Sequence, residues 1–126
     1  MQPTKPIQSQ SKGQGQLGEE EACRYLTTLG YKIVKRNFYY GKVGEIDIVA
    51  MDGEQLVFVE VKARTNTNRG KPEDWVDVRK QQQLKRVAKG YYHINKLVDQ
   101  ACRFDVVAVD MLGGETEIRH QKTAFY

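Results

Sequence analysis

Ionisable side chains interrupt two apolar, β-branched runs within residues 44–64, at positions where a plain core strand would carry none; among them are Glu45, Asp47, Glu60 and Lys62. Two carboxylates that face each other in a half-buried sheet repel. The repulsion is tolerated when a cation lies between them or when one of them takes up a proton. We therefore infer a divalent-metal site from this stretch, with a lysine beside it.

The two runs flank an Asp52-Gly53 pair, which is typical of the turn of a β-hairpin. In the second run, residues 55–64, apolar side chains occupy both alternating positions, so both faces of this strand are expected to be covered. A strand covered on both sides indicates the middle of a layered α/β domain. Glu60 and Lys62 then lie at the end of a buried strand.

The loop length decides whether the carboxylates meet. If Met51 pairs with Leu56, Asp47 lies opposite Glu60, with facing Cβ atoms roughly 4.5–5.5 Å apart. A two-residue loop of Asp52-Gly53 places Asp47 diagonal to Glu60 on the same face, and only an odd loop length separates them.

The elements around the hairpin follow from apolar spacing. Residues 1–14 are rich in Gln, Ser and Lys and are expected to form a disordered tail. A helix is expected over residues 16–29, with Glu19 on its core-facing side, and a strand over residues 31–40. Glu19 serves the site or merely favours the helix N-terminus.

A second helix is expected from Asp77, its N-cap, to about Asn95. Its buried stripe extends back to Lys80 and Gln83, so Lys80 approaches the site or pairs with a core carboxylate. Strands follow over residues 103–111, parallel to a hairpin strand, and near 117–120. Asp105 is expected to be an edge or capping carboxylate. This order predicts a single three-layer α/β/α domain with a mixed central sheet over residues 15–126.

The charge distribution favours a polyanionic partner. The 126 residues carry a net charge of +4 with a pI near 9.1, and the cations concentrate after the hairpin. Those in the loop over residues 65–74 and on the second helix either contact nucleic-acid phosphates or form ordinary solvated surfaces. They are Arg69, Lys71, Arg79, Lys85, Arg86 and Lys89.

The chain has no apolar run of about 18 residues and no apolar signal core at its N-terminus, so we expect a cytoplasmic protein with no membrane span.

The ordered set of motifs resembles known proteins. Asp47 followed by Glu60-Val61-Lys62 resembles the acidic motif of the restriction-endonuclease-like nucleases. The longer pattern resembles the YraN family of small bacterial proteins, which is similar in fold to archaeal Holliday-junction resolvases. The motifs that carry it are Gly18-Glu19, Gly44-Glu45-Ile46-Asp47, the run over residues 57–64 and the run over residues 103–107.

The resemblance implies a restriction-endonuclease-like fold and a division of labour at the site. Mg²⁺, or Mn²⁺, would be bound by Asp47, Glu60 and the carbonyl of Val61, with Glu19 closing the shell from the helix. Lys62, with Asp47 and Glu60 the catalytic set, would orient a water molecule or contact the scissile phosphate.

Four further residues are expected to support the site: Glu45, Arg64, Lys80 and Gln83. In the register described above Glu45 lies opposite Lys62, and a salt bridge between them would either hold the lysine back from catalysis or position it.

Three functions remain open on the sequence. The first is a magnesium-dependent nuclease acting on nucleic acid, most naturally DNA and branched structures by analogy with the resolvases, which also makes a homodimer an expectation. The second is a non-catalytic nucleic-acid-binding module, and the third is a protein interaction adaptor.

Overall fold

The computed structural model describes residues 9–66 and 70–125. Its elements, in chain order, are α1 (Ser9–Thr28), β1 (Lys32–Tyr40), β2 (Gly44–Asp52), β3 (Gln55–Arg64), a 3-10 turn η1 (Pro72–Trp75), α2 (Val78–Ile94), β4 (Cys102–Leu112) and β5 (Glu115–Phe125). The first helix begins earlier than the sequence suggested. Residues 1–8 of the predicted tail lie outside the described residues.

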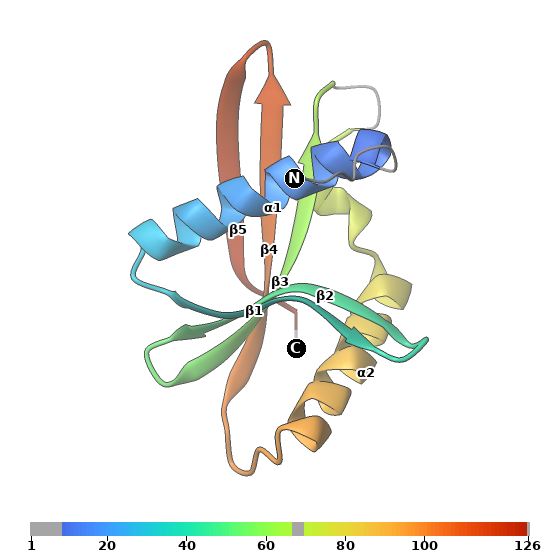
Figure 1. Ribbon diagram of the computed structural model, residues 1–126, viewed down its shortest axis with the longest axis vertical. Coiled ribbons are helices and arrows are strands. Elements are labelled where there is room, and N and C mark those ends of the chain that lie inside the picture. The colour runs from blue at the N-terminus through green and yellow to red at the C-terminus, as the bar shows by residue number, and fades with distance from the viewer. Residues whose placement is uncertain (1–8, 67–69, 126) are drawn as a thin grey trace, which may run out of the picture.

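The five strands form one sheet in the order β1-β2-β3-β4-β5. All neighbouring strands are antiparallel except β3 and β4, which are parallel because α2 connects them (Figure 1). The predicted mixed sheet, with the second hairpin strand in its middle, is therefore confirmed. The last strand is longer than expected and ends at Phe125, whose ring stacks on Phe104 at a centroid distance of 4.8 Å.

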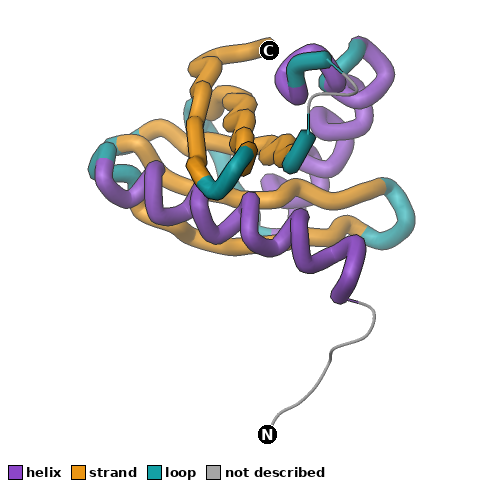
Figure 2. The backbone as a smooth tube through the Cα atoms, turned by 90° about the horizontal axis from the view of Figure 1, so that it is seen from above, coloured by secondary structure: helices purple, strands orange, loops and turns teal. Residues whose placement is uncertain are grey.

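One helix covers each face of the sheet, as Figure 2 shows from above. Ala22 and Leu26 of α1 are buried with Val57 and Val59. On the other face, apolar residues of α2 such as Val87 are buried in a separate cluster. The side chains of β3 alternate between the two cores, which is why this strand is apolar at nearly every position. The three-layer α/β/α architecture is confirmed.

The hairpin has the register in which Met51 lies opposite Leu56, and this pairing continues as far as Ile48 opposite Val59. Beyond that point β2 remains paired with β1 alone, and the two strands cross the rest of the sheet as a ribbon (Figure 1). Ile46 packs in the core under α2, whereas Ile48 packs in the core under α1. Because residues two apart share a face in a regular strand, β2 turns over between them, at Asp47.

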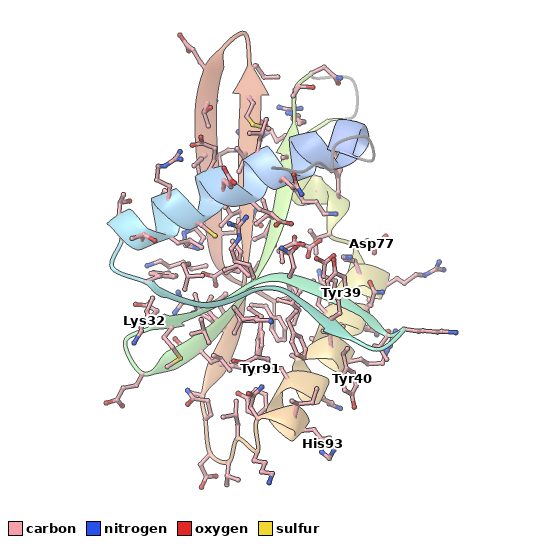
Figure 3. All side chains as sticks on the ribbon, viewed as in Figure 1. Lys32, Tyr39, Tyr40, Asp77, Tyr91 and His93 are labelled. Carbon is pink, nitrogen blue, oxygen red and sulfur yellow. The ribbon has the colours of Figure 1, made fainter. Side chains whose placement is uncertain are left out.

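Two glycines allow the helices to approach the strands closely. A Cβ atom on Gly18 of α1 would lie 2.5 Å from the Cβ atom of Ala63 in β3. A Cβ atom on Gly90 of α2 would lie 2.3 Å from the ring of Tyr40, which lies between α2 and the β1–β2 ribbon (Figure 3). Both distances are too short for any other residue without a shift.

A buried polar network joins β4 and β5 under α1. Asp105 is fully buried; its Oδ1 accepts from Arg103 Nε at 3.0 Å, and its Oδ2 lies 2.7 Å from His120 Nε2. His120 Nδ1 is 3.1 Å from the hydroxyl of Tyr25, and Arg103 donates to the hydroxyl of Tyr31. The expectation of an edge carboxylate was wrong, because β4 is flanked by β3 and β5 and Asp105 compensates a buried guanidinium. The alternative of a capping role agrees with the hydrogen bond that Asp105 Oδ1 accepts from the backbone N–H of Thr123 at 3.0 Å.

Candidate metal centre

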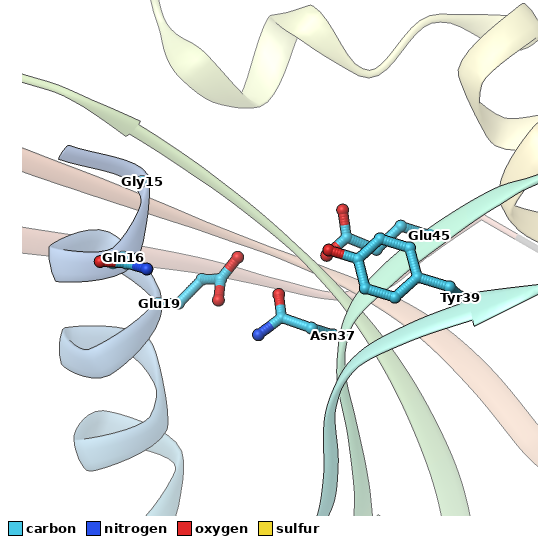
Figure 4. Close-up of a pocket in the computed structure, with 6 residues that line it drawn as sticks. All are labelled: Gly15, Gln16, Glu19, Asn37, Tyr39 and Glu45. Atoms are coloured by element: carbon cyan, nitrogen blue, oxygen red, sulfur yellow. The ribbon is translucent and has the colours of Figure 1, made fainter. Parts of the chain in front are cut away.

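Three carboxylates converge where β2 separates from β3. One oxygen each of Glu19, Glu45 and Asp47 lies within 4.8 Å of the other two. Glu19 comes from α1 and the other two come from β2. Glu19 and Glu45 both line a hollow of about 240 Å³. Figure 4 shows their carboxylates directed toward each other. These are oxygen ligands of the kind that Mg²⁺ and Mn²⁺ bind.

Asp47 takes the place of a backbone acceptor at the end of the hairpin ladder. Its Oδ2 accepts a hydrogen bond from the backbone N–H of Val61 at 2.8 Å. Burial raises the pKa of Asp47 to about 8, helped by the charges of Glu60, Glu19 and Glu45 and opposed by the Val61 N–H. Without a cation this carboxyl therefore keeps its proton to a higher pH than an ordinary aspartate does, and a bound cation would take over the role of the proton.

Glu60 is held by two lysines. Its side chain is 5% exposed, and its Oε2 lies 3.3 Å from Lys62 Nζ and 3.7 Å from Lys80 Nζ. Of the two roles open to Lys80, the structure shows the pairing with a core carboxylate. Glu60 is not one of the three residues whose oxygens converge within 4.8 Å.

The expected pairing of Glu45 with Lys62 was wrong. The β2–β3 ladder ends at Ile48 opposite Val59, so Glu45 does not come to lie across from Lys62. Lys62 pairs with Glu60 instead, and Glu45 lies opposite Tyr39 of β1 and joins the carboxylate cluster. Glu45, which the sequence placed in a supporting role, is thus in the position of a ligand.

Asn37 also faces the cluster, which sequence reasoning missed. With its amide nitrogen turned toward the carboxylates, it donates to Glu45 Oε2 at 2.8 Å and to Glu19 Oε1 at 3.1 Å. Its backbone has a positive φ of 56°, a conformation that asparagine tolerates better than most residues. That tolerance is a weak signal, because nothing in the sequence indicates a break in β1.

Glu19 is half-buried and faces the hollow from α1. Burial and the neighbouring charge of Glu45 raise the pKa of Glu19, while Arg36, whose Nη2 lies 3.7 Å from Glu19 Oε1, lowers it. The sequence prediction that this side chain faces inward agrees with its position in the structure. It reaches the other two carboxylates because Gly18 lets α1 lie against β3.

Two of the expected supporting residues brace the elements around the cluster. Gln83 Nε2 donates to the carbonyl of Val43 at 2.9 Å and so ties α2 to the ribbon. Arg64 binds Asp110 with two hydrogen bonds of 2.8 and 3.0 Å and also donates to the carbonyl of Gly70. Arg64 thereby links the end of β3 to β4 and to the loop that follows.

Most of the expected phosphate contacts are on the surface. Lys71, Arg79, Arg86 and Lys89 are exposed and Lys85 is partly buried, whereas Arg69 lies outside the described residues. Arg79 is next to Lys80, which reaches Glu60, so the basic side of α2 begins beside the acidic site. In the described part of the chain neither helix has the length and apolar composition needed to cross a membrane.

The fold and the site define an α/β domain with a mixed five-stranded sheet and a cluster of carboxylates at the point where its central hairpin opens. The model of the uncharacterised protein family UPF0102 matches residues 18–109, and the chain belongs to this family. This is the YraN family, so the resemblance drawn from the motifs is confirmed.

Three curated relatives match over 90% of their length or more. The UPF0102 protein of Lachnoclostridium phytofermentans is 47% identical over 115 residues, which cover 90% of this chain and 93% of the relative. That of Desulforamulus reducens is 43% identical over 119 residues, covering 91% and 97%. That of Chlorobaculum parvum is 44% identical over 121 residues, covering 88% and 90%. The names of these relatives state no activity.

Proposed function

We propose that this protein is a divalent-cation-dependent nuclease that hydrolyses phosphodiester bonds in DNA. The observation that carries the proposal is the convergence of Glu19, Glu45 and Asp47 beside a buried Glu60 that two lysines hold. Ionisable groups gathered in a half-buried site, with a carboxyl whose pKa is strongly raised, are typical of functional sites.

The cation fits the residues present. Glu19, Glu45 and Asp47 would hold Mg²⁺ or Mn²⁺, both of which favour carboxylate oxygens. The cation would neutralise charge on the scissile phosphate and lower the pKa of the attacking water. Its binding would displace the proton from Asp47, because a ligating carboxylate must be ionised.

The lysine beside the cluster would act on the substrate. Hydrolysis adds the oxygen of water to phosphorus and breaks a phosphorus–oxygen ester bond, and the leaving oxygen receives a proton. Lys62 is partly exposed, and Glu60 holds its ammonium group in place. There it would orient the attacking water or donate to a phosphate oxygen as negative charge develops. The exposed cations of α2 would hold flanking phosphates.

A cleavage assay tests the proposal. End-labelled duplex, single-stranded, flap and four-way-junction DNA, and matching RNA, are incubated with Mg²⁺, Mn²⁺ or EDTA. The wild type should cleave at least one substrate only in the presence of a cation. Asp47→Ala and Glu60→Ala should abolish cleavage, whereas Glu54→Gln, a change at the exposed hairpin turn, should leave it intact. Equal activity of all variants, or activity in EDTA, would reject the proposal.

One observation favours a second function, a nucleic-acid-binding module without catalysis. Glu60 already has two ammonium partners at 3.3 and 3.7 Å, so its charge is compensated without a metal ion. This function predicts DNA binding that weakens with salt, does not depend on Mg²⁺ and is retained in Asp47→Ala.

Absence of both binding and cleavage would instead support an adaptor role. Sedimentation with and without DNA tests the expected homodimer.

A further inference from the structure

We propose that Tyr39 is a stacking platform for one unpaired nucleobase at the mouth of the acidic hollow. The substrate would then be DNA whose bases are exposed beside the bond to be cut, as in a single strand, a frayed end or the unpaired arm of a branch. This inference rests on the proposed function in so far as a polynucleotide is the ligand. It goes beyond it by assigning a base subsite.

The ring of Tyr39 projects away from the core while the aromatic residues on either side of it do not. Tyr39 is 64% exposed, whereas Phe38 is 8% exposed and Tyr40 packs against Gly90 of α2. Alternation along β1 accounts for its direction, because successive side chains point to opposite faces. It does not account for a large aromatic ring at this exposed position.

The position of Tyr39 relates the ring to the candidate cation site. Tyr39 lines the same hollow as Glu19 and Glu45, and in Figure 4 its ring lies beside Glu45. Because β1 is an edge strand of the sheet, no further strand pairs along its outer side within the described residues. A ligand could therefore reach the ring and the carboxylates at the same time.

Stacking on a tyrosine gives a preference for unpaired bases. Every base has a π face, so an exposed ring accepts any base that is free of its neighbours, and this contact carries no sequence preference of its own. In a duplex that face is already stacked on the adjacent base pairs. With the phosphate directed toward the cation, a stacked base would orient the sugar–phosphate backbone in the hollow.

A purely structural role for Tyr39 makes a different prediction. Tyr39 lies opposite Glu45 in the β1–β2 ladder, and its hydroxyl hydrogen-bonds with that carboxylate. If the hydroxyl positions Glu45 and the ring does nothing, Tyr39→Phe and Tyr39→Ala should be equally damaging. If the ring stacks a base, Tyr39→Phe should behave as the wild type.

The experiment measures binding rather than cleavage. A short single strand containing 2-aminopurine and the matching duplex are titrated with the full chain in Ca²⁺, which binds the same kind of oxygen ligands. For the single strand, Tyr39→Ala should raise Kd by about 5- to 100-fold and abolish the fluorescence quenching that stacking causes. Tyr39→Phe should stay within about twofold of the wild type.

For the duplex, every variant should stay within about twofold of the wild type, since its bases cannot reach the ring. Val34→Ala, a change at an exposed position of the same strand, is the matched control and should change nothing. Equal losses for Tyr39→Phe and Tyr39→Ala, equal losses for single strand and duplex, or unchanged single-strand binding by Tyr39→Ala would each overturn the inference. So would a wild type that binds no DNA.

Cleavage and Tyr39-dependent binding are measured separately, so the nuclease proposal and the base subsite can fail independently. If the wild type cleaves nothing but quenches 2-aminopurine in a manner that depends on Tyr39, the base subsite stands and catalysis falls. If cation-dependent cleavage is found and Tyr39→Ala binds and cuts a single strand as well as the wild type does, the nuclease stands and the subsite falls.

Discussion

Asp47 accepts a structural hydrogen bond and also belongs to the carboxylate cluster, because it lies where the β2–β3 ladder ends. Its carboxylate replaces the missing backbone acceptor for Val61 N–H, which ties β2 to β3 where their pairing stops. The same carboxylate lies among Glu19, Glu45 and Glu60, and the pKa of Asp47 is raised to about 8 as a result. Ionising Asp47 at this position is unfavourable, and a cation bound among the carboxylates would offset that cost.

The first prediction concerns Asp47→Asn in metal-free protein. The unfolded chain releases the Asp47 proton near its usual pKa of 3.8, whereas the folded chain keeps it until about pH 8. The native state binds more protons in between, so wild-type stability falls as the pH rises through that window. Asparagine cannot ionise and still accepts from Val61. We expect its Tm to exceed that of the wild type by about 5 °C or more at pH 8.

Thermal melts in EDTA at pH 4.5, 6 and 8 provide the measurement, and the difference between the two proteins should shrink toward pH 4.5. Added Mg²⁺ should raise the Tm of the wild type and leave that of Asp47→Asn nearly unchanged. A variant that is less stable than the wild type at every pH would show that the carboxylate is not under electrostatic strain.

At the scale of elements, the position of α1 decides whether the carboxylates meet. Glu19 follows Gly18 in the helix, and the absence of a side chain at Gly18 lets this turn lie directly on Ala63 of β3. Gly15, one turn earlier, faces open space, with nothing within 4 Å of a Cβ atom built on it. Two glycines in one helix thus have opposite structural requirements.

The second prediction uses this pair. Gly18→Ala should destabilise the protein by about 1–3 kcal/mol, because the added Cβ atom overlaps Ala63 and pushes α1 and Glu19 outward. Gly15→Ala should be neutral or stabilise by about 0.5–1 kcal/mol, because alanine restricts the unfolded chain and favours helix. Urea denaturation gives both values, and calorimetric titration with Mn²⁺ should show weaker binding by Gly18→Ala alone. Equal effects of the two substitutions would contradict the close packing.

At the scale of the whole molecule, the buried network around Asp105 joins elements that are distant in the chain. Arg103 donates to Asp105, to Asp52 of β2 and to Tyr31 ahead of β1, while His120 of β5 connects Asp105 to Tyr25 of α1. The bond between Tyr25 and His120 thus adds a directional contact to the apolar packing that holds α1 on the sheet.

The third prediction is that Asp105→Ala destabilises the protein by about 3–5 kcal/mol, because it removes the fully buried carboxylate that pairs with the Arg103 guanidinium and leaves only the partly exposed carboxylate of Asp52. Burial pushes the pKa of Asp105 up, but hydrogen bonds from His120, Arg103 and Thr123 outweigh it and hold that pKa below its usual value. The stability that Asp105 contributes is therefore complete above about pH 4 and is lost as the pH falls further.

Urea denaturation of Asp105→Ala at pH 7 and at pH 3 tests both parts, and the difference from the wild type should be smaller at pH 3. Glu54→Ala, at an exposed turn position, is the control and should stay within about 0.5 kcal/mol of the wild type. A difference that does not change with pH would assign the loss to packing alone.

The fourth prediction concerns the basic side of the molecule. Arg79 and Arg86 are exposed on α2, two turns apart, and Lys32 is exposed at the far end of β1 (Figure 3). If the α2 residues contact phosphates, the double variant Arg79→Gln with Arg86→Gln should make the negative slope of log K against log salt for DNA binding shallower by about 1.4–1.8. Fluorescence anisotropy at several salt concentrations measures the slope, and Lys32→Gln should leave it unchanged. An unaltered slope in the double variant would indicate that DNA binds to another surface of the protein.

The sequence by itself determined the features that depend on neighbours along the chain. Apolar runs that alternate with a helical segment predict a mixed sheet between helices. One of the hairpin loop lengths considered from the sequence predicts the observed register, in which Met51 pairs with Leu56. Asp77 was identified as the cap of α2, and its side chain accepts from Lys80 N at 2.9 Å. Periodicity and capping act over a few residues, so they can be read without knowing the fold.

Only the tertiary structure decided which ionisable groups meet. A regular hairpin places Glu45 opposite Lys62, but β2 turns over at Asp47, and Glu45 joins the carboxylates while Lys62 pairs with Glu60. The contact between Asp105 and His120 spans two strands and a bulge, and nothing in the local sequence marks it. The twist and separation of the strands and the close packing of the helices depend on the whole core. They decide which charged groups come within a few ångströms of one another, and so which ion pairs form and which pKa values shift.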